Sequence, residues 1–99
     1  MKQILYYLIL GTRGGNTRLK IINSILKKPM NANQISLELN LDYKTIQHHL
    51  KILVENDILI VIKKGKYGAV YFPSDFLQKN LDFWQNLGWI WEKIIKSIK

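Results

Sequence analysis

Hydrophobic residues open the chain as an unbroken run. Residues 4–10 are apolar on every side, so we expect this segment to be buried. The run has no period that separates a helix from a strand, and we favour a helix for residues 1–10. It ends at Gly14 and Gly15, because two adjacent glycines favour an irregular loop.

Apolar residues then recur every three or four positions over residues 19–26, the spacing of one helix face. Asn16 is a suitable N-cap for this helix. Pro29 marks its end, since proline cannot continue a helix. The pattern therefore predicts a first helix over residues 16–28.

Two further helices are joined by a very short turn. Asn31 and Gln34 have the spacing of a capping box at the start of a short second helix. Asn40 follows the last apolar residue of that helix, where a left-handed conformation is common. Asp42 then caps a third helix over residues 43–55. Helices joined by so tight a turn cross at a steep angle, which is the helix-turn-helix arrangement.

The last part of the chain predicts a hairpin followed by a long helix. Residues 58–64 and 67–73 are rich in β-branched and aromatic side chains and flank a basic tip with Gly65, a pattern typical of a β-hairpin. Ser74 would cap a helix of about 24 residues, roughly 36 Å long. This helix is too apolar to be covered by one small domain, so part of it should meet another chain or the N-terminal segment. Its main stripe, which we assign to a dimer interface, is Leu77, Leu81, Trp84, Gly88, Trp91, Ile95 and Ile98.

Composition and charge narrow the class of protein. A chain of 99 residues has room for one domain, and the absence of cysteine excludes disulfides and thiolate metal sites and is compatible with the cytoplasm. No apolar run approaches the ~20 residues of a membrane-spanning helix, so we expect no membrane contact. The net charge is +8, and residues 1–73 hold eleven basic against four acidic side chains. A basic excess of this kind is a common feature of nucleic-acid-binding proteins.

Catalytic and metal sites are not expected. The sequence offers no nucleophile with a paired base, no carboxylate pair and no phosphate-binding loop, so we expect no enzyme and no cofactor. His48 and His49 are adjacent, and neighbouring helical residues point about 100° apart, so they do not form a chelating pair. We expect His49 to pack against the core and His48 to face outward.

The order of these elements resembles that of ArsR-type winged helix-turn-helix regulators, in a form common among archaea. The resemblance is strongest over residues 31–53, where Thr45-Ile-Gln-His-His-Leu is similar to the Thr/Ser-Val-x-x-His-Leu pattern of the family's recognition helix. Gly11-Thr-Arg-Gly-Gly before the first helix is similar as well. Metal-sensing members of the family use Cys ligands or His and Asp pairs that this chain lacks, so metal sensing is not implied.

The resemblance implies a mainly α fold with a small β-hairpin (α+β), in which residues 1–73 form a winged helix-turn-helix and residues 74–99 a dimerisation helix. It implies a homodimeric transcription regulator that binds double-stranded DNA, with residues 43–55 in the major groove and a wing at about residues 63–67 on the backbone or minor groove. An effector is not identified. The residues expected to contact DNA are Tyr43, Lys44, Thr45, Gln47, His48 and Lys51 in the helix and Lys63, Lys64, Lys66 and Tyr67 in the wing.

Several assignments stay open at this point. Arg13, Gly14 and Gly15 would either bind a phosphate or form a flexible connector, and Thr45 would either bind a phosphate or bond back to Asp42. The wing lysines would contact DNA or merely keep the hairpin soluble. Two other functions are compatible with the sequence: a sequence-tolerant protein that coats chromosomal DNA, and a protein-interaction module whose Trp-rich helix is the docking surface.

Overall fold

The computed structural model describes residues 7–63, 65, 68–86 and 93. Three helices pack against one another at its centre: α2 (Gly15–Lys27), α3 (Ala32–Leu39) and α4 (Tyr43–Glu55). Residues 7–10 are helical as well, which agrees with the helix favoured for the start of the chain. The helix-turn-helix predicted from the sequence is formed by α3 and α4, and α4 has the bounds that the sequence predicted.

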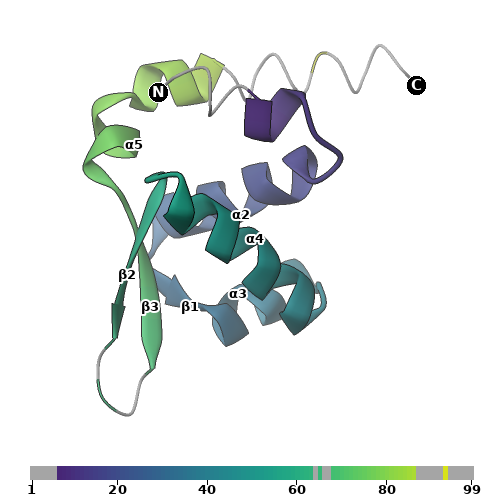
Figure 1. Cartoon of the computed structure of the whole chain (residues 1–99), viewed down its shortest axis with the longest axis vertical. Coiled ribbons are helices and arrows are strands. Elements are labelled where there is room, and N and C mark those ends of the chain that lie inside the picture. The colour runs from purple at the N-terminus through teal and green to yellow at the C-terminus, as the bar shows by residue number, and fades with distance from the viewer. Residues whose placement is uncertain (1–6, 64, 66–67, 87–92, 94–99) are drawn as a thin grey trace.

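A small antiparallel sheet adjoins these helices. The strands β1 (Met30–Asn31), β2 (Leu59–Lys63) and β3 (Ala69–Pro73) lie in the order β1-β3-β2, and the hairpin of β2 and β3 extends away from the helices as a wing (Figure 1). The sequence predicted the hairpin but not β1. With two residues, β1 is too short for a strand pattern, and it pairs with β3 far along the chain.

One hydrophobic core is shared by all of these elements. Its fully buried members come from residues 7–10, from the helices, including the later helix that contains Leu77, and from the start of β2. His49 is also buried, with 7% of its surface exposed, as predicted. The largest fully buried side chains are those of Ile9, Ile21, Ile22, Ile25, Ile35, Ile46, Leu50, Leu53, Ile58, Leu59 and Leu77.

The turn between α3 and α4 is fixed by the bonds that the sequence predicted. The Asn31 side chain accepts from the Gln34 N–H at 2.8 Å, and the Gln34 side chain accepts from the Asn31 N–H at 2.9 Å, which completes a capping box. Asn40 adopts the left-handed conformation, with φ 54° and ψ 48°. Asp42 caps α4 by accepting from the Thr45 N–H at 3.1 Å. These local bonds set the orientation of α4 on the rest of the fold.

The start of α2 differs from the prediction. The helix begins at Gly15 with Gly14 in the cap position, so Asn16 is not its cap, and it ends at Lys27. The reason is a close contact: a Cβ on Gly15 would lie 1.7 Å from the backbone oxygen of Ile9. The glycines therefore form a packed junction between the first helical residues and α2, which is incompatible with a flexible connector.

The predicted long terminal helix is wrong at Asn80. The helix α5 (Asp75–Lys79), capped by Ser74 as predicted, ends there, and a second helical stretch covers residues 81–86. Asn80 makes hydrogen bonds to residues on both sides of it. Its side-chain amide donates to the Phe76 backbone oxygen at 2.8 Å, and its backbone oxygen accepts from the Trp84 N–H at 2.9 Å. The apolar period continues through this break, which is why the pattern did not reveal it.

Two residues of the predicted dimer stripe are buried within one copy of the chain. Leu77 has 0% and Trp84 3% of its surface exposed, and the Trp84 ring N–H donates to the Asn23 side-chain oxygen of α2 at 2.9 Å. Their surface is used inside the protomer, so neither side chain is available to a second copy of the chain. Leu81 is 36% exposed. The remaining stripe residues, Gly88, Trp91, Ile95 and Ile98, lie outside the described residues.

Candidate nucleic-acid interface

The helix α4 has one buried and one exposed face. Ile46, His49, Leu50 and Leu53 are buried and anchor the helix to the core. The opposite face is solvent-exposed and mostly polar or basic. Together with Glu55 at the end of the helix, it includes all six residues predicted to contact DNA: Tyr43, Lys44, Thr45, Gln47, His48 and Lys51.

Thr45 lies at the start of α4 and is engaged with its cap. Its N–H donates to the Asp42 carboxylate at 3.1 Å, and its hydroxyl lies 3.5 Å from the same oxygen. Of the two alternatives for Thr45, the bond back to Asp42 is the one present in this structure. The Thr45 side chain is exposed, so it still lies on the outer surface of α4.

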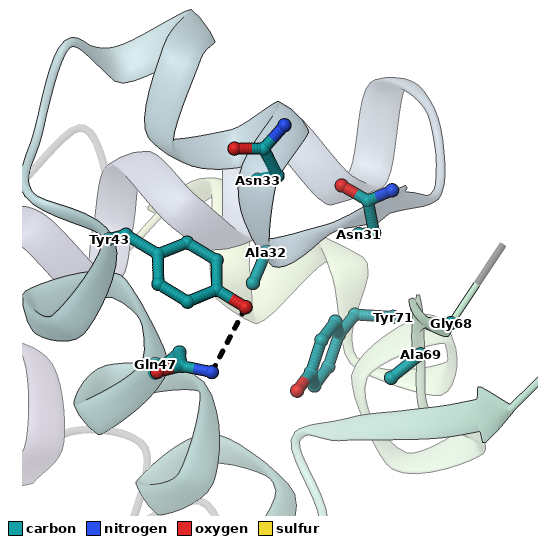
Figure 2. A pocket seen from close by; sticks show the side chains of 8 residues that line it. All are labelled: Asn31, Ala32, Asn33, Tyr43, Gln47, Gly68, Ala69 and Tyr71. Atoms are coloured by element: carbon teal, nitrogen blue, oxygen red, sulfur yellow. Dashed lines mark hydrogen bonds between the residues drawn. The ribbon is translucent and has the colours of Figure 1, made fainter.

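A shallow hollow separates the start of α4 from the wing. Figure 2 shows Tyr43 and Gln47 on one side of it and Tyr71 of β3 on the other. The Gln47 amide donates to the Tyr43 hydroxyl at 3.1 Å. The volume is about 220 Å³, below the roughly 300–1,000 Å³ of typical small-molecule sites. The full lining is Asn31, Ala32, Asn33, Tyr43, Gln47, Gly68, Ala69 and Tyr71.

A second hollow continues this surface along α4. It is lined by Gln47, Lys51, Val54, Glu55, Val61 and Tyr71, so Gln47 and Tyr71 border both hollows. Burial, and secondly the nearby Tyr43, raise the pKa of Tyr71 above its ordinary value. The exposed face of α4 and the side of the wing that faces it therefore form one concave surface, lined by both polar and apolar side chains.

Tyr71, Asn31 and Asn33 belong to this surface but were not among the predicted contact residues. Tyr71 pairs with Val61 across the hairpin and with Met30 of β1, at the middle of the sheet. The alternation of side chains along a strand, applied to residues 69–73, would have placed Tyr71 on one face with Ala69 and Pro73. That signal does not tell which face turns toward α4.

The tip of the wing is basic. Lys63 is exposed at the end of β2, and Gly65 and Gly68 have positive φ values of 48° and 69°, which favour glycine in a tight turn. Lys64, Lys66 and Tyr67 lie outside the described residues. The exposed position of Lys63 is compatible with a contact to a phosphate.

The Gly14–Gly15 junction packs against the buried face of α4, at His49. The Gly15 N–H donates to the Thr12 oxygen and Gly15 is buried, so this N–H is not available to a phosphate, whereas Arg13 is exposed. A Cβ on Gly14 would lie 2.6 Å from Cε1 of His49. The glycines thus allow the start of α2 to approach the recognition helix closely.

A buried cation lies beside His49. Arg18 is 7% exposed and donates from Nη1 to the Leu8 oxygen at 3.0 Å and to the Thr12 hydroxyl at 2.5 Å. Its Nε and the Nδ1 of His49 are buried without a hydrogen-bond partner in the described structure. Burial lowers the pKa of Arg18. Burial, the Arg18 charge and the His48 side chain lower the pKa of His49.

No three His, Cys, Asp or Glu side chains among the described residues gather closely enough to hold a metal ion. None of the helices formed by those residues is long and apolar enough to cross a membrane.

Comparison with known proteins agrees with this geometry. Residues 15–61 match the model of the family described as bacterial regulatory protein, arsR family. No curated protein matches the chain.

Solved structures with the same fold are regulators. A MarR transcriptional regulator from Methanosarcina mazei Go1 has a TM-score of 0.73 at 17% identity, over 96% of this chain and 71% of that one. The PcaV transcriptional regulator from Streptomyces coelicolor in complex with its natural ligand has a TM-score of 0.72 at 13% identity, over 96% and 67%. An ArsR-like transcriptional regulator from Rhodococcus sp. RHA1 has 0.64 at 20% identity, over 97% and 88%.

Identities this low show a shared fold, and the family match adds the class of domain. The matched residues 15–61 contain α2, the helix-turn-helix of α3 and α4, and the first half of β2. The chain therefore has the winged helix-turn-helix fold, and its residues 15–61 are similar to the arsR family.

Proposed function

We propose that this protein is a sequence-specific regulator of transcription that binds double-stranded DNA as a homodimer. The observation that carries the proposal is the concave surface made by the exposed face of α4 and the wing, because it brings side chains suited to base reading beside side chains suited to phosphate binding. Gln47 and Lys51 lie on the helix, and Lys63 lies on the wing beyond them. This combination suits a helix in the major groove flanked by contacts to the backbone.

The residues divide into two roles. Gln47 has an amide that can pair with the N6 and N7 atoms of adenine, so it is the base-reading residue of the proposal. Lys44, Lys51 and Lys63 carry exposed positive charges, which attract phosphates whatever the sequence. Thr45 and His48 complete the surface of α4 that would enter the groove.

The proposed dimer forms at the end of the molecule opposite the wing. Residues 7–10 and 81–86 both lie at that end, away from Lys63 and Ala69 where β2 ends and β3 begins (Figure 1). Tyr7 is 62% and Leu81 36% exposed there, which leaves apolar surface for a second copy. A seam at this end leaves both copies of α4 free for DNA. A two-fold dimer would read half-sites about one helical turn apart.

Gln47→Ala tests the base-reading role. It should weaken binding to the preferred duplex by about 1–3 kcal/mol and leave binding to random duplex almost unchanged, because an amide that pairs with a base carries sequence information. The measurement is fluorescence anisotropy with both duplexes at one fixed salt concentration. Equal losses on the two duplexes would show that Gln47 does not read a base.

Lys63→Ala is the matched control. It should weaken binding to both duplexes alike and reduce the slope of log affinity against log salt by about one, since one phosphate contact is lost. Its exposed position at the end of β2 means that the fold should be unaffected. An unchanged slope would show that Lys63 makes no contact with a phosphate, and the proposed DNA contact would then be limited to α4.

A further inference from the structure

Tyr43 and Gln47 lie one helical turn apart on α4 and are bonded to each other. The Gln47 amide donates from Nε2 to the Tyr43 hydroxyl oxygen at 3.1 Å (Figure 2). Tyr43 is 44% exposed and Gln47 is exposed, so the bond lies at the surface that would face DNA. A free glutamine side chain rotates about three torsions, and a neighbour that holds its amide removes part of the entropy cost of ordering it on a ligand.

The bond leaves Gln47 able to recognise a base. A primary amide has two N–H donors and one carbonyl oxygen, and the Tyr43 hydroxyl takes one of the donors. The other N–H and Oε1 are the donor and the acceptor that a bidentate contact with adenine needs. A hydroxyl at this place therefore orients the amide without using the groups that read the base.

Tyr43 is the first residue of α4 and directly follows the cap Asp42, so its backbone is fixed by the start of the helix. Its ring lines the hollow between the start of α3 and the wing, where Asn33 and Tyr71 lie around it. Tyr43 and Tyr71 are close enough to interact electrostatically, since Tyr43 contributes, after burial, to the raised pKa of Tyr71. The hydroxyl of Tyr43 is thus carried by a planar ring on a capped helix start, which has fewer free torsions than the side chain of a glutamine.

We infer that Tyr43 is a positioning residue for Gln47: its hydroxyl holds the Gln47 amide in the orientation that reads a base, and Tyr43 itself carries no sequence information. Tyr43 was predicted to contact DNA directly, so positioning Gln47 is a different role for it. The inference rests on the proposed function, in which Gln47 is the base reader.

Tyr43→Phe is the variant that tests this role, because it keeps the ring and removes the bond. The preference for the chain's selected duplex over random duplex should fall about three- to tenfold, the effect of one neutral hydrogen bond. Affinity for random duplex should stay within twofold of the wild type. Gln78→Ala is the matched control: it removes an exposed side-chain bond of the same 3.1 Å length, from Gln78 Nε2 to the Pro73 oxygen, which lies outside the concave surface, and it should keep the preference. Thermal melts of both variants check that the fold is retained.

The same change in the Gln47→Ala background separates the inference from the proposed function. If Tyr43 acts through Gln47, Tyr43→Phe should then alter the preference less than twofold. A loss as large as in the wild-type background would show that Tyr43 reads DNA by itself and would overturn the inference while the proposed function stands. An equal loss on random duplex would make Tyr43 a phosphate contact and would overturn it too. If Gln47→Ala keeps the full preference, the base-reading role of Gln47 fails, and the inference fails with it.

Discussion

Gly15→Ala should lower the free energy of unfolding by about 3 kcal/mol or more, because the added methyl group meets backbone rather than a movable side chain. Its Cβ would lie 1.7 Å from the Ile9 oxygen and 2.6 Å from the Ile9 carbonyl carbon. Relief requires the helical residues 7–10 to move away from α2, which would open the core around Ile9. For a domain of this size the melting temperature should fall by more than about 10 °C. Thermal denaturation followed by circular dichroism measures it.

Gly68→Ala is the comparison that separates the clash from backbone strain. Gly68 has φ 69°, and a Cβ there would meet no atom within 4 Å. Its substitution should cost only about 1 kcal/mol, the penalty of placing an L-residue in a left-handed conformation. If Gly15→Ala were no more destabilising than Gly68→Ala, the packed junction between residues 7–10 and α2 would be disproved.

Stability should decrease as the pH falls below about 6.5, and His49 should be the cause. The folded chain lowers the pKa of His49 below its ordinary value of 6.5, first by burial and then by the charge of Arg18. Well above pH 6.5 the imidazole is neutral in the folded and in the unfolded chain, so it does not change the free energy of unfolding with pH. As the pH falls, the unfolded chain takes up a proton that the folded chain resists, so the free energy of unfolding drops by at most about 1.4 kcal/mol per pH unit. The drop ends once the pH is below the folded pKa.

Chemical denaturation of the wild type and His49→Gln at several pH values between 7 and 5 measures this effect. The free energy of unfolding of His49→Gln should change less with pH in that range than that of the wild type, whatever its value at pH 7, because the titrating group is gone. His48→Gln should keep most of the wild-type slope, since burial and the Arg18 charge, the two larger causes of the lowered pKa of His49, are still present. A slope in His49→Gln as steep as in the wild type would show that the acid sensitivity arises elsewhere.

The features predicted well from the sequence are those fixed by local bonds. The capping box of Asn31 and Gln34, the left-handed Asn40 and the caps Asp42 and Ser74 each depend on residues within a few positions. Such bonds are encoded by residue type and spacing, so the helix-turn-helix and its recognition helix followed from the sequence. The buried position of His49 also followed, from the period of α4.

The features missed depend on contacts between distant parts of the chain. β1 exists because it pairs with β3, and Gly15 starts α2 because it packs against Ile9. Asn80 interrupts an apolar period that continues on both sides, and the break lets Trp84 bond to Asn23 of α2. A periodic pattern reports that a residue is buried and does not report its partner.

The candidate site also has features that follow from local sequence and features that depend on contacts between distant parts of the chain. The exposed face of α4 could be read from the sequence, because residues opposite a buried face must face outward. Tyr71 could not, because its place beside Tyr43 and Gln47 depends on how the wing packs against α4. The bond between Tyr43 and Gln47 is local, at i and i+4, and the spacing alone allowed it.

The central claim is that this protein reads a DNA sequence as a dimer, and one binding experiment tests it most directly. Duplexes selected by the full chain from a randomised pool are titrated against unselected duplex at one salt concentration near physiological. The account predicts a shared motif of two inverted half-sites about 10 base pairs apart, two chains bound per duplex and a preference of about 10³ or more over unselected DNA. Selected duplexes without a common motif, bound no more tightly than random DNA, would contradict it and would favour a sequence-tolerant coating protein on the same fold.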